Sequence, residues 1–169
     1  MNAPAPNGTV LMLLCVGFAA AAISDLRYRT IPNTLVSSIA AAGIVHAAAA
    51  LGPRGALASL LGAGAGVALL VWPFARGILG GGDVKLLGAV GAWIGAAETV
   101  RVLLIGAVLG GVLALGFLFN LTRMQRAGVR RNIASFAVPS VEHLDRARAV
   151  PYGVALAGAA AWVLLSGAW

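Results

Sequence analysis

Long stretches without a charged side chain constrain this sequence more than any other feature. Five of them hold at least 21 residues each: 1–24, 30–53, 55–75, 102–122 and 149–169. A hydrocarbon core about 30 Å thick is crossed by roughly 20 helical residues. Charged residues make up 10% of the chain, against roughly 25% in a soluble domain. The sequence therefore predicts an all-α, polytopic membrane protein, and it excludes a disordered chain, a disulfide scaffold and a cytosolic enzyme.

The distribution of charges indicates how many helices cross the membrane. A shorter uncharged stretch, 86–97, spans only if it extends to 84–100, with Lys85 and Glu98 reaching opposite surfaces. With that sixth span, ten of the twelve basic residues face one side: Arg27, Arg29, Arg76, Lys85, Arg123, Arg126, Arg130, Arg131, Arg146 and Arg148. The positive-inside rule makes this side cytoplasmic. With five spans, the most basic loop would face outward.

We therefore predict six transmembrane helices in one membrane-embedded domain, 1–169, with both termini outside and a basic cytoplasmic loop at 122–149. The expected helices are 8–24, 33–51, 55–75, 84–100, 102–121 and 150–168. A net charge of +7 could also suit nucleic acid. However, the basic residues border apolar stretches, so we expect the lipid bilayer as a partner and no nucleic acid.

Small residues recur at spacings that let membrane helices approach closely. They form two groups, the first made of Gly62, Gly64 and Gly66 and the second of Gly106 and Gly110. Because a missing side chain allows two helix backbones to touch, we expect these glycines to serve helix packing.

Two of the five acidic residues fall at the cytoplasmic edge of the predicted bundle. Asp25 ends the first span and Asp83 opens the fourth. An ionisable group near membrane depth is costly and is often functional. The simpler interpretation is a helix-end charge held by Arg27, Arg29 or Lys85, and the two interpretations stay open at this point.

The surroundings of both aspartates favour a functional role. Gly80, Gly81 and Gly82 directly precede Asp83, which would let an extended peptide approach its carboxyl group or let the chain bend. After Asp25, Pro32 suits the first turn of the second span and makes the connection a rigid hairpin. Two carboxyl groups fixed close together cannot both ionise, so one can act as a base toward water and the other as an acid. This is the arrangement of an aspartic protease.

Other hydrolytic chemistries lack the residues that they need. No serine has a glycine two positions before it, and there is no HExxH sequence. The two histidines, His46 and His143, are predicted on opposite sides of the membrane. Cys15 lies in an apolar run, where a thiol is unreactive. We therefore expect no metal and no cofactor.

Three segments resemble the type IV prepilin peptidases, which are GxGD aspartyl proteases. Gly80-Gly81-Gly82-Asp83-Val84-Lys85 is similar to their GxGDxK signature, and Asp25 followed by Arg29-Thr30-Ile31-Pro32-Asn33 is similar to their first-aspartate motif. Pro151-Tyr152-Gly153 resembles a Pro-aromatic-Gly element that opens their last helix. The segments occur in the family's order, so the resemblance covers essentially the whole chain.

The resemblance implies an intramembrane aspartyl endopeptidase with Asp25 and Asp83 as the catalytic pair at the cytoplasmic face of the bacterial inner membrane. It would cut the basic leader from pilin-like precursors. Gly80, Gly81, Gly82, Lys85, Arg29, Pro32 and Asn33 are candidates for substrate binding or for support of the pair. Larger members also methylate the product and carry paired CxxC motifs. This chain shows neither those motifs nor a second cysteine, so the resemblance does not extend to methylation or to a structural zinc, and the chain is similar to the compact Tad/Flp form.

Two hypotheses therefore emerge from the sequence. The first is the peptidase, acting on a Flp-type pilin precursor during pilus assembly or secretion, with a homo-oligomer as one possible state. The second is a six-helix membrane carrier or channel subunit that uses Asp25 and Asp83 as proton or cation sites.

Overall fold

The structure is a computed structural model that describes residues 6–28, 30–77, 79–119 and 152–167. Nearly all of these residues lie in four helices: α1 (Gly8–Tyr28), α2 (Asn33–Ala75), α3 (Gly81–Phe119) and α5 (Tyr152–Ser166). No strand occurs in the described residues, so the prediction of an all-α chain is confirmed. The basic loop predicted at 122–149 lies outside these residues.

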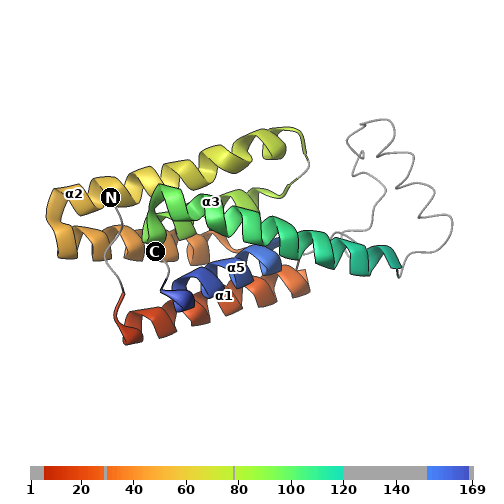
Figure 1. Cartoon of the computed structure of the whole chain (residues 1–169), viewed down its shortest axis with the longest axis horizontal. Helices are drawn as coiled ribbons and strands as arrows, with labels where there is room; N and C mark the ends of the chain where they lie inside the picture. Colours follow the sequence, from red (N-terminus) through yellow and green to blue (C-terminus); the bar gives the residue numbers. More distant parts are fainter. Residues whose placement is uncertain (1–5, 29, 78, 120–151, 168–169) are drawn as a thin grey trace.

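Two of the helices reverse direction at a single glycine. Gly52 in α2 has φ 63° and ψ −149°, and Gly95 in α3 has φ 80° and ψ 172°. Glycine suits both positions because a positive φ is costly for residues that carry a Cβ atom. Figure 1 shows that α2 and α3 each fold back, so that their two halves run antiparallel. The described chain thus forms six helical segments: 8–28, 33–51, 53–75, 81–94, 96–119 and 152–166.

These six segments correspond to the six helices expected from the sequence, but the expected boundary between the fourth and fifth was wrong, and the first helix ends at Tyr28 instead of residue 24. The break between the fourth and fifth segments lies at Gly95 and not near Arg101. The expected boundary lay among charged residues, whereas Glu98 and Arg101 belong to one helical segment. They lie three residues apart and form an ion pair with a 2.9 Å separation. The fourth segment therefore begins at Gly81 and is shorter at its far end than expected.

Glycines allow close contact between the second half of α2 and the first half of α3. A Cβ atom on Gly62 would overlap the carbonyl oxygen of Gly91, and a Cβ atom on Gly91 would overlap that of Gly62. Gly66 meets the carbonyl group of Leu87 in the same way, one turn further along. The packing role expected for Gly62 and Gly66 is therefore confirmed. It is wrong for Gly64, which lies on the opposite face with no atom within 4 Å of a Cβ position.

The second half of α3 packs against α5 through the other pair of glycines. A Cβ atom on Gly106 would lie 2.9 Å from Cδ2 of Leu156, and one on Gly110 would lie 2.6 Å from Cε2 of Tyr152. Both glycines are buried and lie four residues apart, on one face of the helix. The packing role expected for this pair is confirmed, and α5 is held along α3.

Buried polar groups connect α3 to both halves of α2. The indole N–H of Trp93 donates to the carbonyl oxygen of Ile39 at 2.8 Å. The hydroxyl group of Ser59 donates to the carbonyl oxygen of Ala92 at 2.7 Å. Ala92 lies in the turn before the break at Gly95, where helix carbonyl groups lose their usual N–H donors. Ser59 therefore satisfies a carbonyl group that the break would otherwise leave without a partner.

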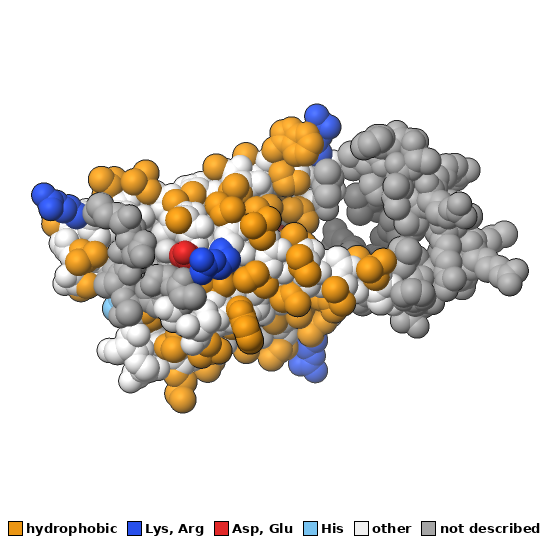
Figure 2. Space-filling model, viewed as in Figure 1, with side chains coloured by type: hydrophobic (Ala, Val, Ile, Leu, Met, Phe, Trp, Pro, Cys, Tyr) orange, Lys and Arg blue, Asp and Glu red, His pale blue; other side chains and the backbone are white. Residues whose placement is uncertain are grey.

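The surface of the described residues is mainly apolar. Large apolar side chains are exposed on all four helices, among them Val16, Leu61, Val108 and Trp162. Figure 2 shows one face on which orange hydrophobic side chains predominate and charged ones are sparse. The helices Gly8–Tyr28, Asn33–Ala75 and Gly81–Gly116 are long and apolar enough to cross a membrane. This surface suits lipid, as expected for a membrane protein.

Candidate active site

Asp25 is positioned by the last turn of α1 and by the short connection that follows. The helix continues to Tyr28, one turn beyond the end expected from the sequence. The hydroxyl group of Ser24 donates to the carbonyl oxygen of Thr30 at 2.7 Å, which closes the connection to α2. Only 9% of Asp25 is exposed. Its carboxyl group therefore points into the helix bundle rather than toward the surroundings.

Asp83 occupies the first turn of α3, at the end of the glycine run. Its backbone N–H donates to the carbonyl oxygen of Gly80 at 3.2 Å, which forms the turn that starts the helix. Asp83 is also 9% exposed and interacts electrostatically with Asp25. The structure thus brings two buried carboxyl groups, far apart in the sequence and on different helices, within electrostatic reach of each other.

The glycines before Asp83 lie against other parts of the chain. A Cβ atom on Gly82 would lie 3.4 Å from Cβ of Ile31, and one on Gly81 would lie 3.3 Å from Cε2 of Phe74. Ile31 is buried and belongs to the connection that follows Asp25. Gly80 is exposed, and a Cβ atom there would lie 3.5 Å from Oδ2 of Asp83. Gly82 thus packs the start of α3 against the α1–α2 connection, whereas a Cβ atom on Gly80 would make only an ordinary contact with Asp83.

Two of the other candidate residues tie α3 to α2. The ammonium group of Lys85 donates to the side-chain oxygen of Asn33 at 2.9 Å, across 52 positions of sequence. Pro32 immediately precedes α2 as its N-cap residue. Lys85 and Asn33 thereby fix the start of α3 beside the start of α2. Arg29 lies outside the described residues.

No site role was expected for the start of α5, yet this turn contacts Asp25 and lies within electrostatic reach of Asp83. Gly153 lies against the carboxyl group of Asp25, and Tyr152 interacts electrostatically with Asp83. The Pro-aromatic-Gly pattern was the signal that could have indicated this contact. Among the described residues, no three side chains of the metal-binding types come together.

The fold and these residues together define a class of protein: a helical, lipid-facing bundle with two buried carboxyl groups at one end. The sequence model of the Type IV leader peptidase family matches residues 12–115, which is more than half of the chain and includes Asp25 and Asp83. The chain therefore belongs to this family. That membership does not favour the carrier or channel hypothesis.

Individual relatives agree with the family match. The chain is 31% identical over 161 residues to a prepilin leader peptidase/N-methyltransferase of Xanthomonas campestris, covering 91% of this chain and 48% of that protein. It is 35% identical over 123 residues to a protein of the same description from Burkholderia pseudomallei, covering 65% of this chain and 38% of that protein. The chain thus spans about half the length of these relatives, or less. No solved structure was found to match it.

Proposed function

We propose that this chain is an aspartic endopeptidase that removes the leader peptide from type IV pilin-like precursors. The observation that carries the proposal is the buried, interacting pair of Asp25 and Asp83 on α1 and α3, in a member of the Type IV leader peptidase family. The relatives described as prepilin leader peptidases support a prepilin as the substrate class. Within that class, we propose a Flp-type precursor as the particular substrate, with a role in pilus assembly or secretion.

The two carboxyl groups provide the acid and the base that peptide hydrolysis needs. Like charges at short range disfavour double ionisation, so the pair holds one proton. The ionised carboxylate takes a proton from water while the water oxygen attacks the scissile carbonyl carbon, and the protonated carboxyl group donates to the carbonyl oxygen. When the tetrahedral intermediate collapses, the C–N bond breaks and the nitrogen takes the proton that came from water. The intermediate returns its hydroxyl proton to the other carboxylate, so the pair again holds one proton.

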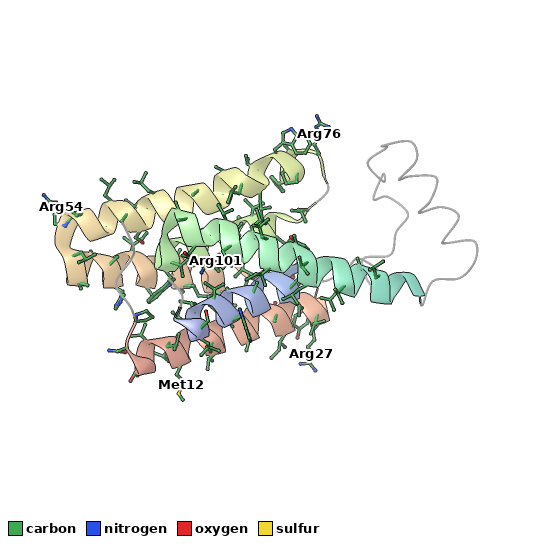
Figure 3. All side chains as sticks on the ribbon, in the orientation of Figure 1. Met12, Arg27, Arg54, Arg76 and Arg101 are labelled. Carbon is green, nitrogen blue, oxygen red and sulfur yellow. The ribbon has the colours of Figure 1, made fainter. Side chains whose placement is uncertain are left out.

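We place this pair at the cytoplasmic face of the bacterial inner membrane, in a bundle of six spans with both termini outside. Figure 3 shows Arg27 and Arg76 toward one end of the molecule and Arg54 at the opposite end. Asp25 lies two residues before Arg27, so the carboxyl pair belongs to the end with more basic residues. The positive-inside rule supports a cytoplasmic position for that end. The six helical segments support the number of spans.

The length of the fourth segment supports a carboxyl pair below the membrane surface. Residues 81–94 cover about 21 Å at 1.5 Å per residue, which is shorter than a hydrocarbon core of about 30 Å. With Gly95 near the outer surface, Asp83 would lie inside the inner leaflet. A precursor would then present its leader junction, which precedes a membrane helix, at the depth of the pair.

Substitution of each aspartate tests the proposal. We expect Asp25→Asn and Asp83→Asn each to lower the rate of leader cleavage at least about 10²-fold, because either loses the acid or the base. The measurement is the ratio of cut to uncut precursor after co-expression with a pilin-like protein that carries a basic leader. Glu98→Gln is the matched control, because it removes an acidic group that pairs with Arg101 and lies outside the site. Cleavage at the wild-type rate by either asparagine variant would refute the assignment.

A further inference from the structure

The first turn of α5 leaves space for one of the two carboxyl groups. Gly153 is buried, and a Cβ atom at this position would lie 2.9 Å from Oδ2 and 3.1 Å from Cγ of Asp25. Both distances are shorter than the ~3.5 Å at which heavy atoms pack without repulsion. Even one methyl group on Gly153 would therefore force the carboxyl group of Asp25 to move.

Glycine is not required here by the backbone. Gly153 lies within α5, and it is absent from the glycines with positive φ, which are Gly52, Gly77, Gly95 and Gly167. In a helix interior, glycine is less stable than alanine by roughly 0.5–1 kcal/mol. Gly158, five residues further along the same helix, is exposed and has no atom within 4 Å of a Cβ position. The close approach of Asp25 is therefore particular to Gly153.

The turn that carries Gly153 is itself fixed in place. The ring of Tyr152 covers Gly110 of α3, where a Cβ atom would lie 2.6 Å from Cε2 and 2.7 Å from Cδ2. One turn later, Leu156 is fully buried against Gly106. Because these contacts anchor α5 to α3, the turn cannot easily withdraw from a side chain added at Gly153. The carboxyl group of Asp25 must therefore move, together with Cδ1 of Ile31, which would lie 3.0 Å from the same Cβ atom.

We propose that Gly153 is a positioning residue, whose missing side chain admits the carboxyl group of Asp25 between α1 and α5 and directs it toward Asp83. The inference rests on the proposed function, since it concerns the geometry of the same pair. A displacement of about 1 Å at a catalytic group can lower a rate about 10²-fold. The role of Gly153 is thus to set the distance across which the two carboxyl groups share their proton.

The first test measures the contact without any need for catalysis. We would prepare wild type, Gly153→Ala, Asp25→Ala and the double variant in detergent micelles and measure the unfolding temperature of each. We expect Gly153→Ala to lower the unfolding temperature more when Asp25 is present than when it is replaced by alanine, because that replacement removes two of the three crowded atoms and leaves only Cδ1 of Ile31 at 3.0 Å. An equal loss in both backgrounds would overturn the proposal. Gly158→Ala serves as the matched control and should not lower the unfolding temperature.

The second test measures the consequence for cleavage. In Gly153→Ala we expect kcat to fall about 10²-fold with KM unchanged, and the pH dependence of kcat to differ from that of wild type, because the proton-sharing distance has changed. Gly158→Ala should match wild type in all three quantities. Wild-type kcat or an unaltered pH profile in Gly153→Ala would refute the positioning role. If wild type itself fails to cut any pilin-like precursor, the proposed function fails, while the unfolding cycle still decides whether Gly153 accommodates Asp25.

Discussion

The contact between Gly62 and Gly91 makes a sharp prediction about stability. In Gly62→Ala, the new methyl group would lie 2.9 Å from the carbonyl carbon of Gly91 and 2.9 Å from Cα of Gly95, and it would overlap the carbonyl oxygen of Gly91. Carbon atoms pack best at about 3.5–4.0 Å. All of these neighbours are backbone atoms, so no side chain can rotate away, and the two helices must separate by roughly half an ångström or more.

Overpacking of this kind costs about 1–3 kcal/mol. We expect a loss toward the upper end of that range for Gly62→Ala, since the separation also weakens the contacts of neighbouring residues. The free energy of unfolding can be measured in mixed micelles by titration with a denaturing detergent. The matched control is Gly64→Ala on the opposite face of the same helix segment, where a Cβ atom meets nothing within 4 Å. It should leave stability unchanged or raise it by up to about 1 kcal/mol.

The comparison of these two variants shows whether α2 and α3 touch through their backbones at Gly62. Equal stability of Gly62→Ala and Gly64→Ala would show that α2 and α3 do not touch through their backbones at this point. If only Gly64→Ala lowered the free energy of unfolding, the face of α2 that carries Gly64 would be the one that packs against α3.

Two further perturbations test other contacts. Ser59→Ala should lower the free energy of unfolding by about 1–3 kcal/mol, because a buried carbonyl group at the α3 break loses its donor; a loss below about 0.5 kcal/mol would mean that another group satisfies it. Lys85→Met and Asn33→Ala should be non-additive in a double-mutant cycle of unfolding, with a coupling of about 0.5–1.5 kcal/mol from their 2.9 Å hydrogen bond. Strict additivity would show that the bond contributes nothing to stability.

Charge placement carried most of what could be predicted from the sequence. Because few charged residues occur, the positions of Asp25 and Asp83 at helix ends stood out, and the structure does bury both and lets them interact. Their catalytic role stays a proposal. The packing of Gly62 and Gly66 also followed from spacing alone, since residues four apart share a helix face.

Features that leave the pattern of charges unchanged could not be predicted from the sequence. The break at Gly95 results from its backbone dihedral angles, which do not affect the pattern of charges. The boundary was therefore expected near Arg101 instead. Gly64 belonged to the same glycine-rich stretch as its neighbours, although its spacing of two places it on the other face. The contact of Gly153 with Asp25 depends on where α5 docks, and the Pro-aromatic-Gly pattern indicates the start of that helix without giving its position beside α1.

Because α3 reverses direction at one glycine, the length of the segment 81–94 sets the distance of Asp83 from the break. Only Gly95 separates the two halves of α3. The position of Asp83 along the helix axis and the direction of its side chain therefore depend on the number of residues between Asp83 and Gly95. One added residue would move the carboxyl group about 1.5 Å farther from Gly95 along the helix axis and rotate it by roughly 100° about that axis. The number of residues from 83 to 95 therefore matters to the proposed catalytic geometry as much as the identity of the acid itself.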